Sequence, residues 1–161
     1  AVSPFGAARD LPEWRPDPFR DDEGDGAGGD VILFADCFNR YFEPENARAA
    51  LKVLEAAGYR VHAPGALCCG RTFLSAGLVE EAKREARRFI DTLKSYVERG
   101  IPGVSVVTTG FTDAVEVQSR ALGFEPAVVF TPHPIQNRTA DELKKIADDV
   151  IEPVLKLLTA A

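Results

Sequence analysis

From residue 31 onward, short apolar runs rich in β-branched residues alternate with longer segments of helical periodicity. This alternation is the strongest constraint on the fold, because successive strand–helix–strand segments form right-handed crossovers between parallel strands. Strands are predicted at 31–35, 59–63, 103–108 and 127–131, and helices at 45–58, 77–99, 112–122 and 139–158. The order predicts an α/β fold: a single three-layer domain with a four-stranded, mostly parallel sheet and flanking helices.

The ends of the predicted helices carry recognisable signals. Gly58, Gly100 and Gly123 stand where a C-terminal cap belongs. Thr139 followed by Glu142 has the spacing of a capping box. Pro153 lies inside the last predicted helix and is expected to kink or interrupt it, because proline lacks the amide hydrogen that helix bonding needs.

The first thirty residues differ from the rest. They hold eight acidic and three basic side chains, four prolines and a glycine-rich run at 24–29. This composition is typical of a linker. We therefore expect 1–30 to be an acidic, Pro/Gly-rich flexible arm, with Trp14 and Phe19 pinning part of it to an α/β domain at 31–161.

Charge and hydropathy exclude several function classes. The net charge of −6 and a pI near 5.0 offer no basic field for nucleic acid. No apolar run approaches the roughly 18 residues of a membrane span. Three cysteines, two of them adjacent, make a poor disulfide framework and indicate a reducing, cytoplasmic setting. The chain begins at Ala1 and contains no methionine, which indicates a fragment, a processed chain or a trimmed one.

The predicted sheet places the reactive side chains together. Ligands of open parallel sheets bind beyond the carboxyl ends of the strands. The segments leaving the four predicted strands there are 36–40, 64–71, 109–110 and 132–134, and they contain all three cysteines and one of the two histidines. We therefore expect Cys37, Cys68, Cys69 and His133 to share one edge.

Several kinds of chemistry suit this edge. Thiolates are soft ligands for zinc or iron–sulfur clusters, and an imidazole can join them, so Cys37, Cys68, Cys69 and His133 are candidate metal ligands. Cys68 or Cys69 is alternatively a reactive thiol. Buried cysteines can also simply pack as small apolar groups.

Four neighbouring residues are candidates for holding a cofactor. Gly70 would allow close backbone approach, and Arg71 could bind a carboxylate or phosphate. Asp36 and Asn39 lie on the same predicted edge. A solvated or helix-capping role is the alternative for Arg71.

Three stretches carry a family resemblance. Residues 36–46 (DCFNRYFEPEN), 53–61 (VLEAAGYRV) and 67–78 (LCCGRTFLSAGL) resemble the cysteine-rich CCG domain of iron–sulfur oxidoreductases, in the form fused to FAD-linked glycolate or lactate oxidases. The resemblance covers about 10–100. It implies a redox, electron-transfer module with an iron–sulfur cluster as cofactor and a flavin-containing dehydrogenase domain or subunit as partner.

The pattern departs from that family after the third predicted strand. The family has a Glu-Pro-Ser-Cys segment there, whereas Val106–Phe111 contains no cysteine. The resemblance therefore implies an incomplete cluster site.

The second half resembles the C-terminal part of the UGSC family. The resemblance rests on ERGIP (98–102), FTDAV (111–115), QSRALG (118–123) and VVFTPHPI (128–135), and covers about 97–158. The chain is thus a join near 94–103 of a CCG-like half, 31–100, and a UGSC-like half, 101–161. Three functions stay open: a redox module, a thiol-based reductase-like domain, and a folded scaffold, recombined or designed, without catalysis. The sequence does not decide whether the chain is itself an enzyme.

Overall fold

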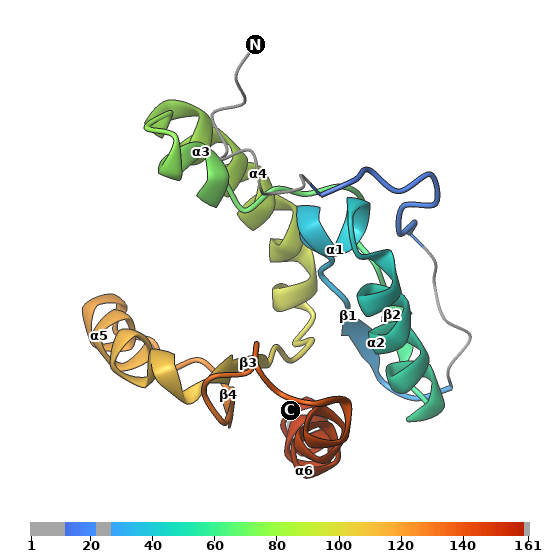
Figure 1. Ribbon diagram of the computed structural model, residues 1–161. Helices are drawn as coiled ribbons and strands as arrows, with labels where there is room; N and C mark the ends of the chain where they lie inside the picture. Colours follow the sequence, from blue (N-terminus) through green and yellow to red (C-terminus); the bar gives the residue numbers. More distant parts are fainter. Residues whose placement is uncertain (1–11, 22–26, 160–161) are drawn as a thin grey trace. The chain divides into compact units, whose positions relative to one another are not determined.

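The computed structural model describes residues 12–21 and 27–159, and it divides the chain into two compact units, 1–94 and 95–161. The first unit contains β1 (Asp30–Ile32), α1 (Cys37–Tyr41), α2 (Pro44–Ala56), β2 (Arg60–His62), α3 (Arg71–Ser75) and most of α4 (Val79–Glu98) (Figure 1). The second contains β3 (Ser105–Thr108), the 3-10 turn η1 (Thr109–Phe111), α5 (Thr112–Leu122), β4 (Val128–Thr131) and α6 (Ala140–Thr159).

The strands of the described chain form two separate parallel pairs. β1 pairs with β2 in the register Val31↔Val61, and β3 pairs with β4 in the register Val106↔Val129. The expectation of one four-stranded sheet in a single three-layer domain is therefore wrong, whereas parallel pairing across a helical crossover is correct. Local periodicity identifies each strand and its nearest crossover partner, but pairing between the halves depends on long-range contacts that no local pattern encodes.

The core of the first unit is small and includes part of the N-terminal segment. Val31 and Val61, neighbours in the ladder, are 2% and 0% exposed. A second cluster joins Phe19 to Ala35 and Ala47, with Leu33, Leu51 and Ala63 packed against it. Phe19 also donates its backbone N–H to the Arg40 carbonyl at 2.9 Å. The described residues 12–21 are thus held against α1 and α2.

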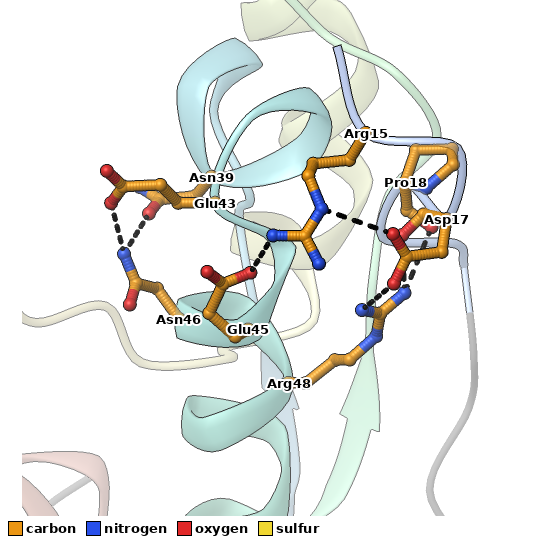
Figure 2. Close-up of polar contacts among 8 residues, drawn as sticks. All are labelled: Arg15, Asp17, Pro18, Asn39, Glu43, Glu45, Asn46 and Arg48. Atoms are coloured by element: carbon orange, nitrogen blue, oxygen red, sulfur yellow. Dashed lines mark hydrogen bonds and ion pairs between the residues drawn. The ribbon is translucent and has the colours of Figure 1, made fainter. Parts of the chain in front are cut away.

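The N-terminal segment is also tied down by aromatic and charged side chains. The Trp14 ring lies 5.1 Å from that of Tyr41 and 4.8 Å from that of Phe42, between centroids. Arg48 of α2 donates to Asp17 Oδ2 at 3.0 Å and to the Asp17 carbonyl at 2.6 Å (Figure 2). Arg15 bridges Asp17 and Glu45, each at 3.4 Å.

The second unit leaves more of its apolar surface uncovered. Val129 and Thr131 of β4 are buried, and α6 packs on this strand. By contrast, Val106 of β3 is 53% exposed and Phe111 is 57% exposed. Among the described residues, no helix combines the length and apolarity that crossing a bilayer requires.

Helix boundaries follow the sequence signals closely. α5 has the predicted bounds, and Gly123 ends it with φ +64°. Glu142 Oε2 accepts from the Thr139 backbone N–H at 2.8 Å, which confirms the capping box. The predicted interruption at Pro153 is wrong, because α6 continues through it. The sequence does not predict α1 and α3, because both helices are too short for helical periodicity to reveal.

Candidate functional site

The first sulfur lies at the start of a short helix after β1. Asp36 caps α1, and its Oδ1 accepts hydrogen bonds from the Asn39 backbone N–H at 2.8 Å and the Asn39 side-chain amide at 3.1 Å. Cys37 is the first residue of this helix and is exposed. The cap fixes the turn from which the Cys37 side chain projects.

The side chains of Asp36 and Asn39 belong to a wider polar network. The Asn46 amide of α2 donates to Asn39 Oδ1 at 3.1 Å and to Glu43 Oε2 at 2.9 Å (Figure 2). These bonds tie α1 to α2 and occupy the groups predicted to hold a cofactor. Cofactor binding by Asp36 and Asn39 stays a prediction.

The second and third sulfurs lie in the segment that follows β2. Leu67 anchors this segment in the interior, and the Gly70 backbone N–H donates to Cys68 Sγ at 3.4 Å. Gly70 has φ +83°, and a Cβ placed on it would lie 2.6 Å from the Ala82 carbonyl oxygen of α4. Gly70 therefore lies against a helix backbone, and its predicted role in cofactor binding stays a prediction.

Cys37 and Cys68 meet through the fold although 31 positions separate them. Each thiol lies near enough to the other for Cys68 to affect the ionisation of Cys37. Although the Cys37 residue is exposed, partial burial of its thiol and then the Cys68 sulfur raise the pKa of Cys37 above its ordinary value, and Asp36 and Cys69 add to the increase. All three thiols are free. The structure thus gathers three thiols into one local group.

Metal binding by Cys37, Cys68 and Cys69 stays a prediction. Within the described part of the chain, no set of three His, Cys, Asp or Glu side chains has a geometry that could hold a metal ion. Arg71 begins α3 and is exposed. Its predicted role in binding an anion stays a prediction.

His133 lies in the second unit, at the carboxyl end of β4. Its Nδ1 lies 3.1 Å from Thr108 Oγ1, at the end of β3. A Cβ on Gly110 would lie 2.8 Å from the same nitrogen, so the glycine makes room for the ring. The cysteines belong to the first unit, so a metal site combining Cys37, Cys68, Cys69 and His133 stays a prediction.

The second unit also contains a hollow beside α5. It has a volume of about 680 Å³ and is lined by residues that include Glu116, Arg120, Phe124 and Phe130. None of the site residues predicted from the sequence lines it. The cysteine group therefore remains the place where reactive side chains gather in the first unit.

Arg40 is the residue near the cysteines whose place the sequence analysis missed. It lies in the strand-end segment 36–40 and is 5% exposed. Its guanidinium donates to the carbonyls of Phe19 at 3.1 Å and Pro64 at 2.8 Å and to Asp21 Oδ1 at 2.9 Å. No sequence signal separates a buried arginine of this kind from a solvated one, because its acceptors lie 19 to 24 positions away.

Comparison with known families confirms both resemblances. Residues 31–107 match the model of the cysteine-rich domain (CCG), and residues 86–160 match that of the UGSC family. The two matches overlap in the region where the join was expected. No solved structure matches the chain.

Curated relatives share the name lactate utilization protein A. The chain is 30% identical to the Bacillus subtilis protein over 125 residues, which is 76% of this chain and 45% of that protein. It is 35% identical to the Bacillus licheniformis protein over 66 residues, which is 40% of this chain and 28% of that protein. The chain thus spans less than half the length of these relatives.

Proposed function

We propose that the chain is a redox module whose centre is the thiol group formed by Cys37, Cys68 and Cys69. The interaction between Cys37 and Cys68 carries the proposal, because Cys68 raises the pKa of the Cys37 thiol although the two residues follow different strands. The match to the cysteine-rich domain and the relatives named for lactate utilization support an oxidoreductase role. In this role the chain serves a flavin-containing dehydrogenase domain or subunit in the reducing cytoplasm.

The residues of this chain do not fit a complete iron–sulfur cluster. Clusters are commonly held by four cysteine thiolates, and the chain has three cysteines in all. The segment Val106–Phe111 supplies no further cysteine. A cluster would need a ligand other than these thiols, so we derive no electron-transfer step through one.

Thiol–disulfide exchange is the chemistry that the geometry supports best. The Cys68 thiolate attacks an external disulfide such as oxidised glutathione, forming a mixed disulfide and releasing one glutathione thiolate. Cys37 gives up its proton and attacks the Cys68 sulfur, which forms the Cys37–Cys68 bond and releases the second glutathione. The two electrons lost by the protein thiols reduce the glutathione disulfide.

Two measurements on the full chain test this proposal. Anaerobically purified protein is analysed for iron and sulfide, and a parallel sample is equilibrated with glutathione and mapped by mass spectrometry. We expect substoichiometric iron and a Cys37–Cys68 disulfide that is lost in Cys68→Ser and kept in the matched Cys69→Ser variant. A full complement of iron and sulfide with a visible charge-transfer band would assign the site to a cluster instead. If the protein contains neither a cluster nor a Cys37–Cys68 disulfide, the chain is a folded scaffold without redox chemistry.

A further inference from the structure

The side chain of Arg40 joins the two segments that carry Cys37 and Cys68. Arg40 lies on α1, three positions after Cys37 and therefore about one helical turn away. Its Nη2 donates to the carbonyl of Pro64, a buried residue at the start of the 64–70 segment. One guanidinium thus links the helix that begins with Cys37 to the loop that contains Cys68.

The other end of the same guanidinium is held by the N-terminal segment. Its Nη1 donates to the Phe19 carbonyl and to Asp21 Oδ1, and the Phe19 ring lies 5.8 Å from its central carbon. Asp21 also faces the loop, since a Cβ on Gly65 would lie 3.3 Å from its Oδ2. This arrangement requires a planar guanidinium, because the side chain must donate hydrogen bonds in two directions at once.

Burial of this cation is only partly compensated. Asp21 is the carboxylate paired with it and is itself 48% exposed, while the other acceptors are neutral carbonyls. Among the described residues, the buried Nε of Arg40 finds no hydrogen-bond acceptor. A buried charge with an unmet donor contributes little net stability. The contacts of Arg40 therefore indicate that it fixes the positions of α1, the 64–70 segment and the N-terminal segment relative to one another.

We propose that Arg40 is a positioning residue for the Cys37–Cys68 thiol pair. By holding Pro64 against α1, it sets the effective concentration at which the two sulfurs meet. This inference rests on the proposed thiol redox function and names a residue on which that function depends.

The loop has a second, independent attachment. Arg88 of α4 donates to the Ala66 carbonyl at 2.6 Å, and Gly70 lies against Ala82 of the same helix. Replacing Arg40 therefore leaves the loop attached to α4 while freeing it from α1. We therefore expect the sulfurs of Cys37 and Cys68 to lie close together less often, while the chain still folds.

Arg48 supplies a matched control. It binds the same N-terminal segment through a carboxylate and two carbonyls, at Asp17 and Pro18 (Figure 2). None of these contacts involves the 64–70 segment. Comparing Arg40→Gln with Arg48→Gln separates thiol positioning from docking of the N-terminal segment.

The experiment measures the glutathione equilibrium constant of the Cys37–Cys68 disulfide in the full chain, with circular dichroism to verify folding. We expect Arg40→Gln to lower this constant by about tenfold or more, because small displacements of reacting groups carry large penalties. Arg48→Gln should change it by no more than about twofold, since exposed ion pairs contribute little. Arg40→Lys should restore only part of the equilibrium constant lost in Arg40→Gln, because the ammonium group of lysine cannot donate in the two directions of a planar guanidinium.

A second readout keeps this inference separate from the proposed function. Dibromobimane becomes fluorescent when it bridges two nearby thiols, so its rate reports proximity without any redox step. If the unsubstituted chain is bridged but forms no disulfide, the thiol redox function fails, and bridging in the variants still tests Arg40. The inference would be overturned if the Arg40→Gln variant folds and dibromobimane bridges its thiols as fast as those of the unsubstituted chain. If that variant does not fold, Arg40→Lys decides in the same way.

Discussion

Gly70 lies so close to Ala82 that a Cβ on the glycine would stand 2.6 Å from the alanine carbonyl oxygen. The contact joins the segment bearing Cys68 to the backbone of α4, which cannot move aside as a flexible side chain could. Gly70 also has φ +83°, a conformation that L-residues with a Cβ adopt at a cost.

Gly70→Ala is therefore expected to destabilise the first unit. The left-handed conformation alone costs roughly 1–3 kcal/mol, and the clash with α4 adds to it. Denaturant unfolding of the full chain measures the loss, and the bridging rate of Cys37 and Cys68 should fall with it, because Gly70 also donates to Cys68 Sγ.

Gly77→Ala is the matched control for this substitution. Gly77 has φ +78°, but a Cβ there would meet no atom within 4 Å. It carries the conformational penalty without the clash. Equal losses of stability in the two variants would show that the approach to Ala82 is unimportant.

The three thiols should differ in their reactivity with iodoacetamide. Because burial and the Cys68 sulfur raise the pKa of Cys37, its alkylation should rise at a higher pH than that of an ordinary thiol. Cys68→Ser should shift the Cys37 profile toward lower pH. Mass spectrometry of peptides alkylated across a pH series reads both effects, and an unchanged Cys37 profile in Cys68→Ser would contradict the contact.

The same pKa increase has a consequence for stability. The folded chain holds the Cys37 proton more tightly than the unfolded chain does. The stabilisation is complete below the ordinary thiol pKa of 9.0 and is lost as the pH rises through the higher folded value. The Cys37→Ser variant should not show this loss of folding stability at alkaline pH.

Glu142 should make stability depend on pH at the acid end. The Thr139 backbone N–H, and then Arg138, lower the pKa of its carboxyl. This contribution is present above the ordinary carboxyl pKa and is lost as the pH falls through the lowered folded value. Thermal unfolding should therefore separate Glu142→Gln from the unsubstituted chain at neutral pH and less so near about pH 3.

Trp14 is the chain's single tryptophan and reports on the N-terminal segment. It packs against Tyr41 and Phe42, and Arg48 holds the same segment through Asp17. Arg48→Gln should increase acrylamide quenching of Trp14 fluorescence while shifting the thermal midpoint only slightly. Unaltered quenching would show that Arg48 does not restrain the segment.

Gly110 should control the ring of His133. A Cβ on Gly110 would lie 2.8 Å from His133 Nδ1. The same nitrogen lies 3.1 Å from Thr108 Oγ1. Gly110→Ala should therefore displace the imidazole and change its nitrogen chemical shifts in NMR spectra. Gly103→Ala, where a Cβ meets nothing within 4 Å, should leave them unchanged.

Local signals account for what the sequence could predict of the fold. Gly123 and the Thr139–Glu142 pair are interactions within one turn of a helix, so their outcome does not depend on distant residues. The four-stranded sheet failed because it required contacts between the two halves. In the site, the rule for strand ends places Cys37 and Cys68 after neighbouring strands, and their joint role stays a prediction. Burial of Arg40 could not be anticipated, since carbonyls far along the chain create it.

The two-stranded ladders also determine how this chain can meet others. With only one partner each, β1, β2, β3 and β4 are all edge strands within the described residues. Each edge strand presents one row of backbone donors and acceptors to which another strand can be added. On β3 the half-exposed Val106 lies on such an edge. Each parallel pair thus keeps two edges without a strand partner among the described residues.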